Sequence, residues 1–197
     1  MDRKRFFDNI AHEWEKEHQS PQEISRLRHL VKYFPLKKGD CVLDAGCGTG
    51  RLIPWVRAAI GDKGMLVESD FSREMLKIGK AKYNQRNICF VQSSAQCLAV
   101  KGRFIDVIIC FALFPHISDK LNALCEFRRV LKPRKPLVIA HPMSREELNC
   151  FHSRVKGPVT QDFLPEDEEM KRLFEEAGFS GLSINNKKSL YIAKAYA

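Results

Sequence analysis

The chain has no hydrophobic run long enough to cross a bilayer. Its most apolar stretch, residues 104–114, contains Asp106 and has about the length of one strand with its exit loop, whereas a membrane helix needs roughly 20 apolar residues. The first fourteen residues, MDRKRFFDNIAHEW, lack the apolar region and the small-residue cleavage site of a signal peptide. These absences predict a cytoplasmic protein without a membrane span.

Cysteines at CxxC spacing are also missing. The seven cysteines are an odd number, and most of them lie in apolar, strand-like contexts; they are Cys41, Cys47, Cys89, Cys97, Cys110, Cys125 and Cys150. A disulfide framework or a structural zinc site usually has paired cysteines at short spacing. We therefore expect reduced, buried thiols and no metal.

Length and composition are those of one globular domain. The 197 residues are 44% hydrophobic and 29% charged, and a chain of this size can bury a core without disulfides. The formal net charge is +9. Residues 41–140 hold sixteen basic and eight acidic side chains, which is nearly all of the excess. A basic balance favours an anionic partner, either a nucleic acid, a membrane surface or an acidic small molecule.

Strand-like and helix-like segments alternate along the chain. Apolar runs predict strands at residues 41–46, 65–70, 87–94, 104–112 and 136–142, and a hairpin at 181–197. Helical spacing predicts helices at residues 50–61, 73–86, 119–132 and 165–179, after two N-terminal helices that are separated near Ser20 and Pro21. This alternation is typical of a doubly wound α/β sandwich whose seven-stranded sheet is mostly parallel, with a C-terminal antiparallel hairpin.

The most informative motif is VLDAGCGTG at residues 42–50. A strand ends at Asp44, and Gly46, Gly48 and Gly50 then form a tight turn into a helix. Glycine permits the close approach of a ligand, because a Cβ would occupy that space. In a parallel sheet the ligand is expected beyond the carboxyl ends of the strands. A dinucleotide site would have the spacing G-x-G-x-x-G, which disfavours a nicotinamide-dependent oxidoreductase.

This motif resembles the cofactor loop of class I S-adenosyl-L-methionine (SAM)-dependent methyltransferases, and the resemblance covers nearly the whole chain. ESDFSREML (68–76), FIDVIICFALFPHISD (104–119) and RRVLKPRKPLVIA (128–140) are similar to further regions of that family. The overall pattern looks closest to the small enzymes typified by ubiquinone and menaquinone biosynthesis methyltransferases. The resemblance implies a Rossmann-like fold, a methyltransferase activity, SAM as cofactor and S-adenosyl-L-homocysteine (SAH) as product.

The resemblance also implies roles for individual residues. The glycine loop with Cys47 would surround the methionine part of SAM, Asp44 would orient the loop or reach the cofactor amino group, and Asp70 would bind the ribose hydroxyls. Phe71, Ser94 and Ala95 would lie at the adenine, and residues 110–112, beginning with Cys110, would line the pocket wall. Ser94 stands where the family often has Asp, and Arg134 and Lys135 replace a usual Gly-Gly pair. Glu68 is an alternative ribose ligand, but Asp70 directly precedes the x-Ser helix start.

Three histidines are candidate catalytic bases, because histidine titrates near neutral pH. His116 and His141 follow the fourth and fifth predicted strands, and His152 lies in the segment that comes next. Arg145, Asn149 and His152 have the spacing of one helical face. That face is either an acceptor site, with Arg145 contacting an acidic group, or a solvated connecting helix.

The sequence predicts two parts with different roles. Residues 1–40 would form a helical lid, with Phe6, Phe7 and Trp14 mainly packing against the rest of the protein, and residues 41–197 would form the SAM-binding domain. We expect a small-molecule acceptor. Methylation of nucleic acid is a second hypothesis, disfavoured because Cys-Phe-Ala-Leu-Phe-Pro after the fourth strand is not a base-methylation motif and because basic residues are not interleaved with aromatic ones. A third hypothesis is a SAM-binding protein without catalysis.

Overall fold

The protein is a three-layer α/β sandwich. The computed structural model describes residues 3–17, 20–155 and 157–197. Within these residues the strands are β1 (Cys41–Ala45), β2 (Met65–Asp70), β3 (Ile88–Gln92), β4 (Val107–Phe111), β5 (Pro136–His141), β6 (Ser180–Lys187) and β7 (Leu190–Tyr196). They form a sheet of order β3-β2-β1-β4-β5-β7-β6. Strands β1 to β5 are parallel, and β7 runs antiparallel to both β5 and β6. The predicted fold class, including the C-terminal hairpin, is confirmed.

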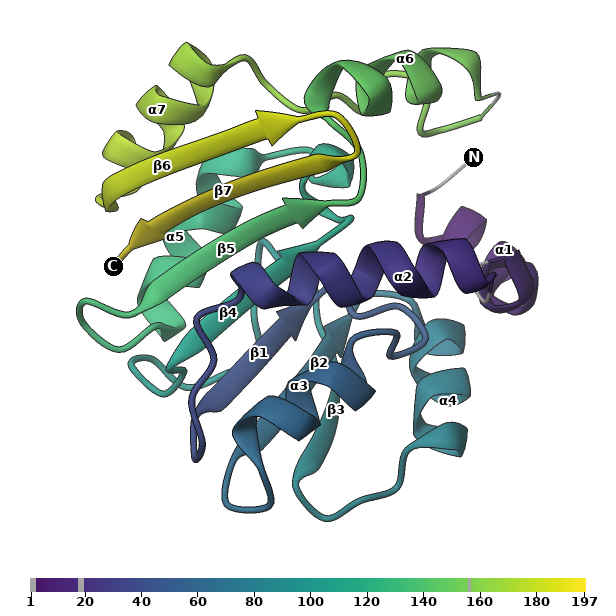
Figure 1. Ribbon diagram of the computed structural model, residues 1–197, viewed down its shortest axis with the longest axis vertical. Coiled ribbons are helices and arrows are strands. Elements are labelled where there is room, and N and C mark those ends of the chain that lie inside the picture. Colours follow the sequence, from purple (N-terminus) through teal and green to yellow (C-terminus); the bar gives the residue numbers. More distant parts are fainter. Residues whose placement is uncertain (1–2, 18–19, 156) are drawn as a thin grey trace.

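Helices cover both faces of the sheet (Figure 1). The α-helices in the described residues are α1 (Arg3–Glu17), α2 (Pro21–Leu30), α3 (Ile53–Ile60), α4 (Arg73–Lys82), α5 (Lys120–Val130), α6 (Arg145–Arg154) and α7 (Asp167–Glu176). Short 3₁₀ turns follow α2 at Val31–Tyr33 and β4 at Phe114–His116. None of the helices in the described ranges is long and apolar enough to cross a membrane.

Two hydrophobic clusters form the core, one on each face. Side chains of α2 and α3, such as Leu27, Leu30 and Val56, pack on one face of β1 and β4. Side chains of α5 and α7, such as Phe127 and Phe174, pack on the other face. The strands between them are apolar nearly throughout, as expected for parallel strands buried on both sides. Helix α2 therefore belongs to a layer of the sandwich. The other helix of the predicted lid, α1, approaches the ends of the strands.

Local sequence signals explain where several helices begin. The Ser72 side chain accepts a hydrogen bond from the backbone of Met75, and Asp119 accepts one from Asn122, as N-cap residues do. Helix α4 ends at Lys82, four residues earlier than predicted, because Tyr83 turns into an extended conformation and packs against the α2–α3 cluster. Strand β4 is shorter than predicted and begins only at Val107.

The surface turn before β5 has a non-glycine residue in the left-handed region. Arg134 has a φ of 61°, a backbone conformation that favours glycine. Its amide donates to the Ala197 carbonyl at 2.6 Å, which ties this turn to the last residue of the chain. The replacement of Gly-Gly at residues 134–135 thus falls on a turn remote from the ends of the parallel strands where ligands bind.

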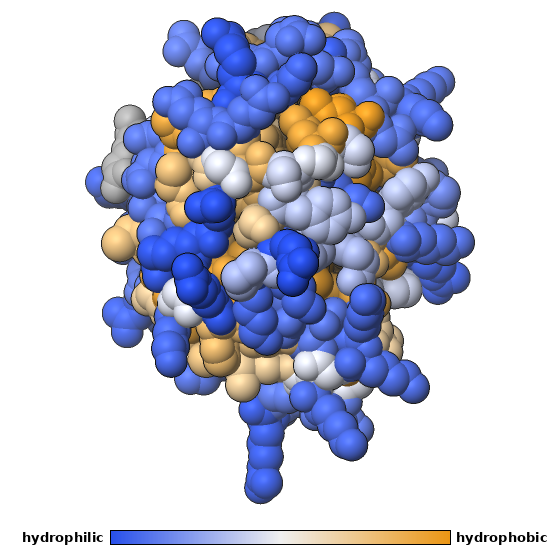
Figure 2. Space-filling view, turned by 90° about the vertical axis from the view of Figure 1, so that its left-hand side faces the viewer, coloured by the Kyte–Doolittle hydropathy of each residue, from blue (hydrophilic) through white to orange (hydrophobic). Residues whose placement is uncertain are grey.

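Several basic side chains of the central hundred residues form ion pairs outside the strands. Lys132 and Lys135 both contact Asp106, at 2.9 and 3.1 Å, and Arg129 pairs with Glu126 at 2.6 Å. Figure 2 shows one face of the molecule covered largely by hydrophilic side chains, with smaller hydrophobic patches between them. The charge excess of the central hundred residues therefore lies largely outside the sheet.

Candidate active site

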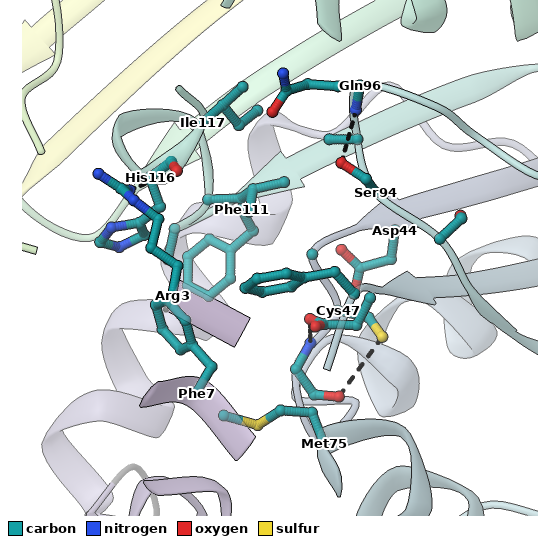
Figure 3. Close-up of a pocket in the computed structure, with 18 of the residues that line it drawn as sticks. Arg3, Phe7, Asp44, Cys47, Met75, Ser94, Gln96, Phe111, His116 and Ile117 are labelled. Carbon is teal, nitrogen blue, oxygen red and sulfur yellow. Dashed lines mark hydrogen bonds between the residues drawn. The ribbon is translucent and has the colours of Figure 1, made fainter. Parts of the chain in front are cut away.

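A cavity opens at the carboxyl ends of β1, β2 and β4 (Figure 3). Its floor is formed by the turn after β1, and Phe7 and Trp14 of α1 lie among the residues that close it. The carboxyl ends of neighbouring parallel strands meet at one edge of a sheet, and connections that leave in opposite directions open a crevice there. The cavity is therefore in the position that the sequence predicts for a ligand site.

The predicted glycine turn forms that floor. Gly46, Gly48 and Gly50 have φ values of 73°, 56° and 82°. The amides of Gly46 and Cys47 both donate to the Ser69 carbonyl, at 2.8 and 3.0 Å, which fastens the turn to β2. Gly46, Cys47 and Gly48 line the cavity, whereas Gly50 does not. Gly50 shapes the turn, because a Cβ on it would lie 2.5 Å from Ile53 at the start of α3.

Gly46 is the position of the turn at which a side chain is expected to cost most. Its Cβ would lie 2.8–2.9 Å from the side chain of Leu113, which itself lines the cavity. Positive φ costs Ala about 1 kcal/mol, and the overlap adds about 1–3 kcal/mol. We expect Gly46→Ala to lower the free energy of unfolding, measured in urea, by about 2–4 kcal/mol.

A matched control separates strain from overlap. Gly39 also has a positive φ, of 86°, and its Cβ would meet nothing within 4 Å. Gly39→Ala is therefore expected to lose only the strain energy, about 1 kcal/mol. Equal losses in the two variants would show that contact with Leu113 does not matter.

Asp70 lies at the end of β2 on the wall of the cavity. Its side chain is nearly buried, and its two carboxylate oxygens accept hydrogen bonds from the amides of Gly48 at 2.9 Å and Ser72 at 2.8 Å. Burial raises the pKa of Asp70 to about 6, although these backbone hydrogen bonds lower it. Phe71 follows directly and also lines the cavity, whereas Glu68 does not. The position of Asp70 is thus the one that a ligand can reach.

The opposite wall comes from the segment after β3. Ser94, Ala95 and Gln96 line the cavity. The backbone amide of Gln96 donates to the Ser94 hydroxyl at 3.2 Å (Figure 3). Cys110, predicted in the wall, is fully buried within β4 and does not line the cavity. The wall instead begins at Phe111, because the alternation of the strand turns Cys110 toward the α5 face.

A histidine–aspartate pair lies at one end of the cavity. His116 lines the cavity, and its Nδ1 lies 2.7 Å from the carboxylate of Asp162, whose side chain is 2% exposed. Arg3 of α1 donates to both oxygens of the same carboxylate, at 2.7 and 2.5 Å, and to the His116 carbonyl (Figure 3 shows Arg3 beside His116). Burial raises the pKa of Asp162, but the hydrogen bonds from His116 and Arg3 outweigh this and hold the pKa below its usual value.

His152 joins this group from behind. Its ring centroid lies 5.0 Å from that of His116, and its Nδ1 donates to the backbone carbonyl of Asp162. His152 is buried and does not line the cavity. Desolvation lowers its pKa, so that the ring is neutral near pH 7. The structure therefore brings His152 to the back of the His116–Asp162 pair and not to the reacting space.

His141 is a correction to the sequence prediction. The residue is 1% exposed at the end of β5, next to Tyr191, and it does not line the cavity. Its Nε2 has no hydrogen-bond partner in the part of the chain that the structure describes. Burial lowers the pKa of His141 to about 3, which removes it as a base near pH 7. The sequence correctly places His141 at a strand end, but the side chain of His141 points into the protein.

The predicted face of Arg145, Asn149 and His152 exists, but it is occupied. Asn149 exchanges two hydrogen bonds with the backbone of Leu164, at 2.8 and 3.0 Å. Arg145 pairs with Asp167 and with Glu166. All three side chains of the face therefore bind the segment that follows α6. A substrate role for Arg145 and Asn149 is not supported by this geometry, because neither lines the cavity, and the terminal nitrogens of Arg145 and the amide group of Asn149 already have partners.

Two contributors to the site were not found from the sequence. Asp162 lies in an irregular segment without a motif, 46 residues from His116, and Arg3 is 159 residues from Asp162. Phe7 and Trp14 were interpreted as packing residues. They do pack, with Phe7 next to Phe71 at 5.7 Å between ring centroids, but both also line the cavity. Only the aromatic spacing of the N-terminal segment signalled them.

A metal centre is not part of this arrangement. Within residues 3–17, 20–155 and 157–197, no group of three or more His, Cys, Asp and Glu side chains could hold a metal ion. Of the three candidate histidines, His116 and His152 bind Asp162, and His141 is buried close enough to both for their charges to lower its pKa.

A family model described as "Methyltransferase domain" matches residues 42–134. The chain is 30% identical to the ubiquinone/menaquinone biosynthesis C-methyltransferase of Francisella philomiragia over 77% of this chain and 71% of that protein. It is 28% identical to the protein of the same name from Shewanella frigidimarina, over 81% of this chain and 74% of that one.

Solved structures give the same fold. A SAM-dependent methyltransferase from Aquifex aeolicus is 25% identical and has a TM-score of 0.75, covering 95% of this chain and 97% of that chain. A possible histamine N-methyltransferase from Thermotoga maritima, 17% identical, has a TM-score of 0.76 and covers 98% of both chains. At 17% identity, the likeness to the Thermotoga maritima protein concerns the fold alone.

Proposed function

The chain belongs to the ubiquinone/menaquinone biosynthesis C-methyltransferase family of SAM-dependent methyltransferases, and from this premise we propose that it methylates a small molecule in the cavity above β1 and β2. The observation that carries the proposal is the cavity floor. The glycine turn, the carboxylate of Asp44 and the carboxylate of Asp70 all line one space beyond the strand ends. These groups fit SAM, which has an ammonium group, a ribose diol and a sulfonium.

The residues around the cavity suit the parts of this cofactor. We assign Asp70 to the ribose hydroxyls, since a carboxylate can accept two hydrogen bonds, and Phe71 with Ser94 and Ala95 to the adenine. Gly46, Cys47 and Gly48 would lie along the methionine part, with Asp44 facing its amino group. When bound, SAM supplies a methyl group on a positively charged sulfur and leaves as neutral SAH.

The His116–Asp162 pair is suited to take a proton from the acceptor. With its Nδ1–H donated to Asp162, neutral His116 keeps a lone pair on Nε2. Asp162 stabilises the imidazolium that forms, and Arg3 holds Asp162 in place from α1. A hydroxyl that gives its proton to Nε2 becomes a stronger nucleophile, either at oxygen or at a conjugated carbon. We propose His116 as the catalytic base and His152 as a residue that positions Asp162.

The acceptor is proposed to be small. Phe7 and Trp14 close the cavity from α1, which favours a compact molecule over a polymer. The relatives are named for C-methylation in quinone biosynthesis, so the first acceptor to test is a reduced naphthoquinone. Arg145 is not expected to bind an acidic acceptor, because its side chain already pairs with acidic residues.

Titration calorimetry tests the cofactor assignment. We expect SAM and SAH to bind with one-to-one stoichiometry and Kd values of about 1–100 μM, in the range common for enzyme substrates, while NAD gives no heat of binding. NAD is the control because it also contains adenosine. Binding of NAD with no binding of SAM or SAH would contradict the proposed function.

A further inference from the structure

Two carboxyl groups lie side by side beneath the glycine turn. Asp44 on β1 and Glu68 on β2 are directly opposite in the parallel register, so their side chains leave the same face of the sheet on strands about 4.8 Å apart. The residues are 1% and 0% exposed. Asp44 lines the cavity and its carboxylate points into it (Figure 3), whereas Glu68 lies behind it. A ligand bound in the cavity can therefore affect Glu68 only through Asp44.

These carboxyl groups have unused hydrogen-bonding capacity. Oδ1 of Asp44 and both oxygens of Glu68 have no hydrogen-bond partner among the described residues. The adjacent thiol of Cys47 donates to the Gly48 carbonyl at 3.6 Å, and it is also close enough to Glu68 for a hydrogen bond that lowers the pKa of Glu68. A buried polar atom without a partner is costly and rare. Oδ1 of Asp44 is buried, but the residue lines the cavity, so the charge of a bound ligand can act on its carboxylate.

The neighbouring charges that act on this pair are negative. Burial raises the pKa of Asp44 to about 8, with a further contribution from Asp70, and burial with the charge of Asp44 raises the pKa of Glu68 strongly. Asp8 of α1 lies beyond Asp70. The strands on either side contribute the apolar Ile109 and Phe90.

Two arginines line the same cavity, and both have other contacts. Arg3 binds Asp162. Arg51 lies over the ring of Phe111, at 5.8 Å from its centroid, and 3.9 Å from Glu23. Neither is among the groups that act on the pair. Two carboxylates so close together cannot both ionise without a counter-charge.

We propose that Asp44 and Glu68 share a proton in the free protein and release it to solvent when the positively charged SAM fills the cavity. The inference rests on the proposed function, because it takes SAM as the ligand. Release of the shared proton leaves both carboxylates ionised, with two negative charges beneath the sulfonium and the ammonium group. SAH has no sulfonium, so the pair keeps more of its proton when SAH is bound. Glu68 acts through Asp44 and touches neither cofactor nor acceptor.

The sign of the pH dependence follows from this linkage. Below about pH 8 the free pair holds the proton, and binding must remove it. SAM affinity is therefore expected to rise with pH between 6 and 8, by as much as tenfold per pH unit if one proton is released, and to level off above pH 8. SAH affinity is expected to change less. Asp70 also titrates in this range, but it faces the ribose that both ligands share, so the difference between SAM and SAH isolates the pair.

Calorimetry in two buffers measures the proton directly. SAM and SAH are titrated into the protein at pH 7 in phosphate and in Tris, whose ionisation enthalpies differ, and the difference in heat gives the protons released. We expect the protein to release up to about one proton more with SAM than with SAH. In Glu68→Gln that difference should vanish, because the amide donates to Asp44 and keeps it ionised before the ligand arrives.

A matched variant and a second measurement complete the test. Glu74→Gln makes the same change on α4, where the side chain is exposed and pairs with Lys77, and it should leave the proton count unchanged. The unmodified protein is also titrated with SAM from pH 6 to 9. This measurement does not depend on the folding of any variant. A flat affinity across that range, or an unchanged proton difference in Glu68→Gln, would overturn the inference. If SAM fails to bind at all, it is the proposed function that fails.

Discussion

Asp70→Ala is expected to lower the affinity for SAM and for SAH at least about a hundredfold. The carboxylate is the cavity group assigned to the two ribose hydroxyls, and a hydrogen bond to a charged group contributes about 1.5–3 kcal/mol. The substitution also removes the acceptor that holds the Gly48 amide, 2.9 Å from Asp70. Both effects act on parts that SAM and SAH share, so the two ligands should lose affinity together. Titration calorimetry measures both losses.

Asp70→Asn separates charge from shape. The amide keeps the size of the side chain and one acceptor oxygen, so we expect a loss between that of the alanine variant and none. Thermal unfolding without ligand shows whether the alanine variant is still folded. Affinities within about threefold of the unmodified protein would contradict the ribose assignment, because each charged hydrogen bond alone accounts for more than that.

His116→Asn is expected to lower kcat for methyl transfer to the reduced naphthoquinone by about a hundredfold to a thousandfold, the usual range for loss of a general base. The asparagine amide can still donate to Asp162, so the Arg3–Asp162 contact is preserved and only the basic Nε2 is lost. Affinity for SAM should stay within a few-fold. Transfer of a radiolabelled methyl group from SAM, at saturating cofactor, measures the effect.

His152→Asn is the matched control for this prediction. His152 contacts the same segment through the Asp162 carbonyl, but it does not line the cavity. Its substitution should therefore change kcat by less than about tenfold, with the pH–rate profile retained. Turnover by His116→Asn at the normal rate would show that the acceptor needs no base from this residue.

The fold could be predicted because its signals are local. Apolar runs of strand length, the N-caps Ser72 and Asp119, and the glycines after β1 act over a few residues, and each appears in the structure, although β4 begins later than its apolar run. The cofactor side of the cavity follows from the same logic. Residues that come directly after parallel strands must meet at one edge of the sheet, and Asp44, Asp70 and Ser94 do so.

Side-chain direction could not be predicted in the same way. His116 and His141 both stand near a strand end, but His116 lies on the cavity wall after an irregular turn, while His141 remains in the strand and is buried. Helical spacing placed Arg145, Asn149 and His152 on one face correctly. What that face contacts was decided by the segment 162–167, which folds back over α6.

The sequence alone determined the doubly wound sandwich, the glycine turn and the place of Asp70 at the end of β2, because period, caps and motif spacing are properties of short segments. Only the tertiary structure decided which groups work together. Arg3, His116 and Asp162 are separated by 113 and 46 positions along the chain and meet through packing of three elements. The Asp44–Glu68 pair depends on the register between β1 and β2. No local pattern encodes such contacts, since they arise when surfaces that are distant in the chain are buried together.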